Sequence, residues 1–356
     1  MPTSLSEPAV PVRGEFLLVT CHAGAEAAVV QRQEQIVPAA RKAAWRRGVV
    51  TFRLGDPGGN AYDPPDDFFP DLVFARTCIR SLGQVAGTSD AERLARLLET
   101  AGTAAWRNVH VWSREPAIEA PLEEIRGRLL EACGLANEGP VARPGDLVLD
   151  CLLDSVDRWW VGWHRAATPS STWPGGTYPG SLPDHAVSRA WLKLDEAIAT
   201  FGIRLHSGER AVELGAAPGG ACQRLLEAGL EVVGVDPALV ADGVAAHARF
   251  QQWRKRARDV RLREFRGFDW IVCDMNIDPS STMESLGRIV TAPGVRPRGI
   301  VATLKLPQWS RAEALPGWLA EFRAWGFSPA ARQLCTGGRE ICVVAVRDGG
   351  AGGRGG

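Results

Sequence analysis

The stretch VELGAAPGG, residues 212–220, decides how the second half of the chain is interpreted. An apolar run leads into it, and the helix-forming sequence GACQRLLEAG, residues 220–229, follows. Glycines let the backbone come close to a ligand, and the N-terminus of a helix presents free N–H groups. The stretch therefore predicts a turn, between a buried strand and a helix, that can hold a phosphate or a nucleoside.

Two common nucleotide-binding motifs do not fit this turn. The dinucleotide motif G-x-G-x-x-G is absent, since Gly215 is followed by Gly219 and Gly220, and Pro218 has no N–H to donate. The phosphate-binding P-loop needs a lysine directly after Gly220, and none is there. Asp236, at the end of the next apolar run, can accept hydrogen bonds from both hydroxyls of a ribose. These features favour a nucleoside without a pyrophosphate, such as S-adenosylmethionine, and a nucleotide fold of another purpose is the alternative.

Strand-like and helix-like segments alternate through residues 187–347, which predicts an α/β domain with a doubly wound, mostly parallel sheet. Predicted strands cover residues 210–215, 230–236, 268–275, 299–306 and 340–346, and predicted helices cover 188–201, 220–229, 281–291 and 311–325.

Residues 1–165 mix short strands and helices without an enzyme-type glycine loop, which is typical of an α+β accessory region. We predict strands at 14–20, 46–54, 72–87, 108–113, 147–154 and 158–166, helices at 24–35 and 90–101, and a loop at 55–71. Residues 166–186 are rich in Pro, Gly, Ser and Thr and are predicted to be a connector rather than core. The Gly-rich residues 348–356 are predicted to be a disordered tail.

Composition narrows the class of protein without identifying it. Lys and Arg number 41, as do Asp and Glu, so the overall charge does not favour nucleic acid as a partner. The eight cysteines show no C-x-x-C spacing and the six histidines no metal-type cluster, so we expect free, buried thiols and no metal. There is no secretion signal and no long apolar run, so we expect a cytoplasmic protein without membrane contact, and a monomer.

Charged residues follow or precede apolar runs at four places in the second half of the chain. Asp274 and Lys305 each end a predicted strand, and ligands bind at the carboxyl ends of the strands in an open parallel sheet. A charge at one strand end is often simply solvated, but two opposite charges beside a nucleoside turn suggest a site. Lys193, on the preceding helix, and Glu340, at the start of an antiparallel edge strand, are predicted to join them.

These segments occur in the order SRAWLKLDEA, ELGAAPGG, VCDM, LKLP and the strand that begins at Glu340, and in this they resemble the FtsJ-like ribose 2′-O-methyltransferases. The earlier segments FARTCIRS and WWVGWHRA resemble the branch that modifies a cytidine of bacterial large-subunit ribosomal RNA. The resemblance is strong over residues 186–346 and implies a Rossmann-like methyltransferase domain, S-adenosylmethionine as cofactor, and a THUMP-like RNA-binding region in residues 1–165. Glu213 stands where the family more often has Asp.

The resemblance implies a Lys-Asp-Lys-Glu catalytic set. Lys305 is the expected general base, Asp274 its orienting partner, and Lys193 and Glu340 the residues that align the ribose. We expect the two lysines to lower each other's pKa, which would make a neutral amine available. Residues expected to hold the cofactor are Ser188, Glu213, Gly215, Ala216, Ala217, Pro218, Gly219, Gly220, Asp236, Asp259 and Asp274.

Residues 249–266, RFQQWRKRARDVRLREFR, could bind RNA phosphates or form the solvated face of a helix. Trp159, Trp160 and Trp163 favour core packing over base stacking, whereas Trp173, Tyr178 and Arg189 flank the region where substrate could lie. The leading hypothesis is 2′-O-methylation of large-subunit ribosomal RNA. The alternatives are the same reaction on tRNA or an mRNA cap, an RNA-binding protein with an inactive methyltransferase fold, and, third, a nicotinamide dehydrogenase.

Overall fold

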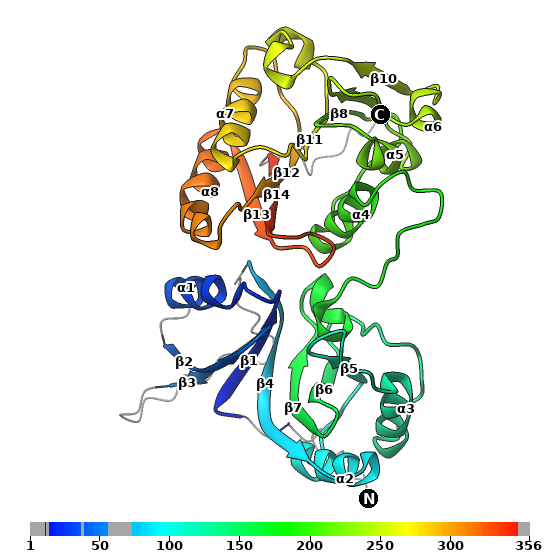
Figure 1. Cartoon of the computed structure of the whole chain (residues 1–356), viewed down its shortest axis with the longest axis vertical. Helices are drawn as coiled ribbons and strands as arrows, with labels where there is room; N and C mark the ends of the chain where they lie inside the picture. The colour runs from blue at the N-terminus through cyan, green and yellow to red at the C-terminus, as the bar shows by residue number, and fades with distance from the viewer. Residues whose placement is uncertain (1–10, 12–13, 37–38, 56–72, 348–356) are drawn as a thin grey trace, which may run out of the picture. The chain divides into compact units, whose positions relative to one another are not determined.

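The computed structural model describes residue 11 and residues 14–36, 39–55 and 73–347, which divide into two compact units. Unit 1 ends at Tyr178 and unit 2 begins at Pro179, within the predicted connector (Figure 1). The predicted loop 55–71, apart from Gly55, and the predicted tail 348–356 lie outside the described residues. Among the described residues, no helix has the length and apolar character needed to cross a membrane.

Unit 1 is built on a seven-stranded sheet in the order β2-β3-β1-β4-β7-β6-β5, in which only the β5–β6 pair is parallel. Its strands are β1 Phe16–Cys21, β2 Ala40–Arg46, β3 Val49–Leu54, β4 Ala75–Ala86, β5 Asn108–Ser113, β6 Leu147–Ser155 and β7 Arg158–Arg165, and its helices are α1 Glu26–Ile36, α2 Asp90–Ala101 and α3 Leu122–Ala132. Sequence analysis missed α3 and β2, since the strand predicted at 46–54 corresponds to β3 and contains only the last residue of β2.

The core of unit 1 contains the tryptophans of β7. Trp159 and Trp163 have no exposed surface, and Trp160 packs against a second buried cluster, so the core-packing prediction is confirmed. The first half of the predicted connector also belongs to this core. Its short 3₁₀ turn, Pro169–Thr172, buries three small hydroxyl side chains, which corrects the prediction that this segment lies outside the core.

Unit 2 contains a second seven-stranded sheet, in the order β10-β9-β8-β11-β12-β14-β13. Its strands are β8 Arg210–Leu214, β9 Glu231–Val235, β10 Phe250–Trp253, β11 Trp270–Cys273, β12 Gly299–Lys305, β13 Phe327–Arg332 and β14 Glu340–Arg347, and its helices are α4 Ala190–Phe201, α5 Gly220–Glu227, α6 Asp242–Ala245, α7 Pro279–Val290 and α8 Leu315–Ala324. The five strands from β10 to β12 run parallel, and β14 is antiparallel to both of its neighbours. This confirms the Rossmann-like α/β domain. The antiparallel direction predicted for the strand of Glu340 is confirmed, but its place at the edge is wrong, because β13 pairs with the outer side of β14.

Helices cover both faces of this sheet: α4 and α5 lie on one side, and α7 and α8 on the other (Figure 1). On the α4/α5 face, Leu194, Leu225 and Val272 belong to one buried apolar cluster. The basic stretch 249–266 is not helical, which corrects the alternative of a solvated helix face. It forms β10 and two 3₁₀ turns, Ala257–Asp259 and Leu262–Phe265.

Candidate functional site

The glycine turn lies where β8 ends and α5 begins. Gly215 and Gly219 have φ values of 83° and 109°, which are left-handed conformations that side chains other than glycine rarely adopt. Gly220 has a different role, because a Cβ there would lie 2.2 Å from Ser188 Oγ and 2.9 Å from Trp191 N. The turn therefore needs glycine twice for backbone conformation and once for the close packing of α5 on α4.

Asp236 lies at the carboxyl end of β9, directly beside this turn. Its Oδ2 accepts a hydrogen bond from Ala217 N at 3.2 Å, and its Oδ1 accepts one from Ala238 N at 2.8 Å. A carboxylate oxygen has lone pairs for more than one donor, so the two backbone bonds fix the side chain without using up its acceptors. This placement suits the predicted ribose partner.

Glu213 lies on β8 with only 1% of its surface exposed. Burial raises the pKa of its carboxyl to about 8, and the nearby carboxylates of Asp274 and Asp236 act in the same direction. Its Oε2 has no hydrogen-bond partner among the described residues. An unpartnered buried oxygen beneath a glycine turn is suited to a donor from a bound ligand, since leaving it unpaired costs about 1–3 kcal/mol.

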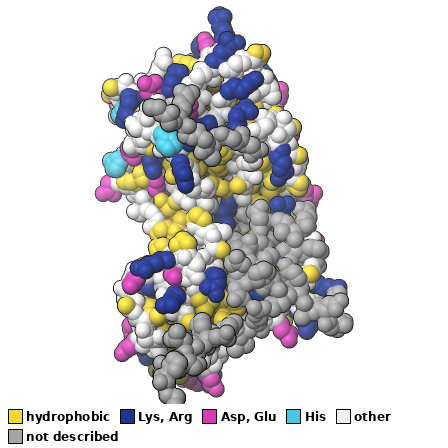
Figure 2. Space-filling view, turned by 180° about the vertical axis from the view of Figure 1, so that it is seen from behind, with side chains coloured by type: hydrophobic (Ala, Val, Ile, Leu, Met, Phe, Trp, Pro, Cys, Tyr) yellow, Lys and Arg dark blue, Asp and Glu magenta, His cyan; other side chains and the backbone are white. Residues whose placement is uncertain are grey.

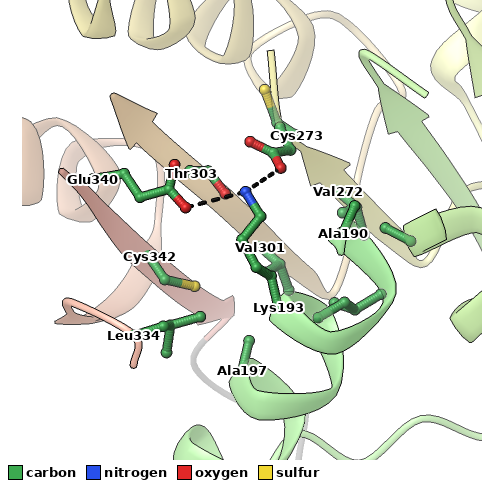
Figure 3. Close-up of a pocket in the computed structure, with 13 residues that line it drawn as sticks. Ala190, Lys193, Ala197, Val272, Cys273, Val301, Thr303, Leu334, Glu340 and Cys342 are labelled. Carbon is green, nitrogen blue, oxygen red and sulfur yellow. Dashed lines mark hydrogen bonds and ion pairs between the residues drawn. The ribbon is translucent and has the colours of Figure 1, made fainter. Parts of the chain in front are cut away.

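The four predicted catalytic residues come together at the carboxyl edge of the sheet. Lys193 Nζ lies 2.5 Å from Asp274 Oδ2 and 3.0 Å from Glu340 Oε1. Lys305 Nζ lies 2.8 Å from Asp274 Oδ1 and 2.6 Å from Glu340 Oε2. Each ammonium thus touches both carboxylates, and Figure 3 shows the Lys193 ammonium between Glu340 and the second carboxylate. The four charges come from separate parts of the fold: Lys193 lies on α4, Lys305 ends β12, Glu340 begins β14, and Asp274 directly follows β11.

The electrostatics of this cluster correct one expectation. Burial alone would lower the pKa of Lys305, but Asp274 and Glu340 outweigh it and the pKa is raised. Burial would likewise raise the pKa of Asp274, but Lys193 and Lys305 outweigh it and the pKa is lowered. The prediction that the two lysines lower each other's pKa is therefore wrong for Lys305 in the free protein, because each lysine is paired with two carboxylates.

Of the other residues predicted to lie at the site or near the substrate, some lie beside the glycine turn and the catalytic cluster, and others lie elsewhere. Ser188 lies against Gly220 at the start of α4, and Arg189 is exposed one turn before Lys193. Asp259 is 59% exposed and faces Arg258 at 3.9 Å. Trp173 is 7% exposed and packs edge-on against Tyr178 in unit 1, so its ring is not free to stack on a base.

Sequence analysis missed two buried polar groups. Glu196, on α4, is 2% exposed and hydrogen-bonded to the loop before Glu340. Its position one turn after Lys193, on an otherwise apolar helix face, could have identified Glu196 from the sequence. In unit 1, His110, Asp150 and His164 come together from three strands, a grouping that the spacing of the histidines in the sequence does not reveal.

This histidine cluster is an ion pair beside a neutral imidazole. His164 Nδ1 lies 2.6 Å from Asp150 Oδ2, and His164 Nε2 lies 2.7 Å from the carbonyl oxygen of Ser171. Burial alone would lower the pKa of His164, but the effect of Asp150 is larger, and the pKa of His164 is raised. Burial holds the pKa of His110 well below its ordinary value. Because both nitrogens of His164 are already hydrogen-bonded, this ring has no lone pair for a metal, and its bond to Ser171 fastens the Pro169–Thr172 turn to the sheet.

The family model and the curated relatives that match this chain are described as methyltransferases. The family model described as FtsJ-like methyltransferase matches residues 186–312, which contain Lys193, Asp274 and Lys305 but end before Glu340. Three curated relatives share the name ribosomal RNA large subunit methyltransferase M. The protein of Thauera aminoaromatica is 30% identical over 86% of this chain and 88% of its own length. The protein of Halorhodospira halophila is 30% identical over 93% of this chain and 96% of its own length. The protein of Methylococcus capsulatus is 32% identical over 69% of this chain and 70% of its own length. Among solved structures, TrmN from Thermus thermophilus covers 93% of this chain and 99% of its own at 16% identity and a TM-score of 0.33, which is too low to support an argument.

Proposed function

The chain belongs to the ribosomal RNA large subunit methyltransferase M family, and on this premise we propose that it methylates the ribose 2′-oxygen of a cytidine in large-subunit ribosomal RNA, with S-adenosylmethionine as methyl donor. The observation that carries the proposal is the closed cluster of two lysines and two carboxylates beside the glycine turn. A protein that only bound RNA would have no need of this arrangement.

The site fits the cofactor on two grounds. The glycine turn allows close approach of a ligand, and Glu213 has an unpartnered oxygen beneath it. Asp236 would bind the ribose hydroxyls of the cofactor, and Glu213 would accept from its amino group. When bound, S-adenosylmethionine supplies a methyl group on a positively charged sulfur.

Transfer requires the 2′-hydroxyl to lose its proton as its oxygen forms the new bond to carbon. In the free protein Lys305 is an ammonium held by two carboxylates, so it must first release one proton to solvent. A positive ligand nearby acts in that direction, since a like charge lowers the pKa of a lysine. Neutral Lys305 then takes the hydroxyl proton, Asp274 and Glu340 stabilise the ammonium that forms, and Lys193 stays charged and orients the ribose. S-adenosylmethionine would supply the methyl carbon for the new bond, and its sulfur would keep the electron pair of the bond to that carbon.

An exposed basic segment in unit 2 and an exposed tryptophan in unit 1 support RNA as the substrate. All eight basic side chains of residues 249–266 are exposed, and Figure 2 shows Lys and Arg side chains at the end of unit 2 where this segment lies. Arg254, Lys255 and Arg256 directly follow the carboxyl end of β10, on the same edge of the sheet as Asp236. In unit 1, Trp45 is 61% exposed on the outer strand β2 and is followed by Arg46. We propose that unit 1 is the THUMP-like RNA-binding region.

All eight cysteines are free, which supports action in the reducing cytoplasm. The monomeric state stays a prediction.

The function is tested by mapping 2′-O-methylation of ribosomal RNA at nucleotide resolution in cells with the gene, without it, and with Lys305→Ala in its place. We expect one cytidine of the large subunit to lose its methyl group in the last two. In vitro, Lys305→Ala should lower kcat by at least about 100-fold, since general-base catalysis contributes about 10²–10⁴, while the Kd of S-adenosylhomocysteine stays the same. An unchanged map would overturn the ribosomal assignment, and normal turnover of Lys305→Ala would overturn its role as base.

A further inference from the structure

Glu196 is a buried carboxylate with three donors and no role in the reaction as described above. It lies on α4, three residues after Lys193, and is 2% exposed. Its Oε1 accepts a hydrogen bond from Cys335 N at 2.6 Å, and its Oε2 accepts two from Thr336, from N at 2.8 Å and from Oγ1 at 2.6 Å. Charge-assisted bonds of this length are among the stronger ones in proteins, so the contact is a firm anchor between α4 and a distant loop.

The loop that Glu196 holds, residues 333–339, leads directly into catalytic Glu340. It is folded on itself by bonds from Gln333 Nε2 to the carbonyl of Gly338, at 2.9 Å, and from Glu340 N to the same carbonyl, at 2.9 Å. A Cβ on Gly337 would lie 3.0 Å from Glu340 Oε1, so the loop backbone lies against the catalytic carboxylate. Movement of the loop would therefore move Glu340.

We propose that Glu196 is a positioning residue that fixes Glu340 relative to the two catalytic lysines; this inference rests on the proposed function. Helix α4 holds the start of β14 at two points one turn apart, directly through Lys193 and indirectly through Glu196. Without the second point, the backbone of Glu340 would still be held by the pairing of β14 with β12, but its carboxylate would be positioned only by the loop's own bonds and by the two flexible lysine side chains. A displacement of about 1 Å in an active site can cost about 10²-fold in rate, so the loss would be visible in kcat.

The position of Glu340 also sets the charge state of Lys305. Glu340 is one of the two carboxylates that raise the pKa of Lys305. If Glu340 moves away, Lys305 loses a proton more easily, and the rise of kcat with pH should begin at a lower pH. A residue that only stabilised the fold would not shift this profile.

The test uses the purified full-length chain and a matched pair of variants on one helix. Glu196→Gln keeps the size of the side chain but replaces one acceptor oxygen with a donor amide. Asp195→Asn is the control, because Asp195 is the neighbouring acidic residue on the same helix and pairs with Arg224 Nε of α5 at 2.7 Å. Thr336→Val removes the hydroxyl, one of the three donors to Glu196, and Thr336→Ser keeps a hydroxyl at this position. We would measure kcat and KM for RNA, the Kd of S-adenosylhomocysteine, the melting temperature and the pH profile of kcat.

A second measurement does not depend on turnover. Cys335 is half-buried in the loop, and mass spectrometry can follow its alkylation by a maleimide. We expect Glu196→Gln to lower kcat by about 10-fold or more, to shift the pH midpoint downward, to speed alkylation of Cys335 and to leave the cofactor Kd within about twofold. Thr336→Val should show the same changes more weakly, and Thr336→Ser and Asp195→Asn should match the wild type.

The proposal is overturned if Glu196→Gln keeps the wild-type pH midpoint and alkylation rate. It is also overturned if Glu196→Gln and Asp195→Asn lower kcat and melting temperature alike, which is the pattern of general destabilisation. If the wild-type chain transfers no methyl group to any RNA, the proposed function fails, and the alkylation rate still decides whether Glu196 holds the loop.

Discussion

Glu213 makes the stability of the protein depend on pH in a direction opposite to most carboxyl groups. Its pKa is raised from 4.5 to about 8 by burial, so between these values the folded chain keeps a proton that the unfolded chain has lost. The free energy of unfolding should therefore fall as pH rises through this window. We expect Glu213→Gln to be more stable than the wild type at pH 8, by an amount on the order of a few kcal/mol, and to lose that advantage near pH 5. Urea unfolding at both pH values checks this, and an equal difference at the two would contradict it.

Single residues also show which parts of the site could be predicted from the sequence. Asp274 and Lys305 were identifiable because a charge after a buried parallel strand must lie at the ligand edge of the sheet. The charge state of Lys305 could not be predicted in the same way. It depends on Glu340, which is brought to Lys305 only by the antiparallel pairing of β12 and β14. Glu196 was missed for a similar reason: its partners, Cys335 and Thr336, lie about 140 residues away in the sequence.

At the scale of elements, the contact between α4 and α5 predicts the effect of one methyl group. In Gly220→Ala the new Cβ would meet Ser188 Oγ and the backbone of Trp191, and backbone cannot swing aside as a long side chain can. Helix α4 must then move away from α5, which would displace Lys193. We expect a loss of about 1–3 kcal/mol in stability, together with a lower kcat. Gly243→Ala is the matched control, because a Cβ there meets no atom within 4 Å; equal effects of the two variants on melting temperature and kcat would contradict the packing argument.

The strands that sequence analysis did not recognise share one property. β2, β10 and β13 are all edge strands of their sheets. An edge strand is paired on one side only and can be polar or contain proline, so it lacks the apolar run that identifies an inner strand. β13 contains Pro329, and six of the seven residues of β2 are exposed. The inner strands of unit 2 were predicted because they are buried on both faces and read as continuous apolar runs.

At the scale of the whole molecule, each unit has its own sheet and its own buried clusters. All the residues assigned here to the cofactor and to catalysis lie after Pro179. We therefore expect residues 179–356, produced alone, to fold and to bind S-adenosylhomocysteine with nearly the affinity of the full chain. Its KM for RNA should be much higher if unit 1 supplies RNA contacts. Calorimetric titration with the cofactor product and RNA-binding assays on both proteins check this, and equal RNA affinity would contradict a binding role for unit 1.

The place of β14 has a consequence for the order of events during synthesis. β14 is made after β12 and β13, yet it lies between them in the sheet, and β13 is paired with β14 alone. Until β14 has been synthesised, β12 has an open edge and β13 has no place in the sheet. Glu340 is the first residue of β14, so the same event completes both the sheet and the ring of charges. A nascent chain that has folded everything before this strand can already have formed the cofactor turn, but with the role proposed for Glu340 we expect no methyl transfer before β14 is in place.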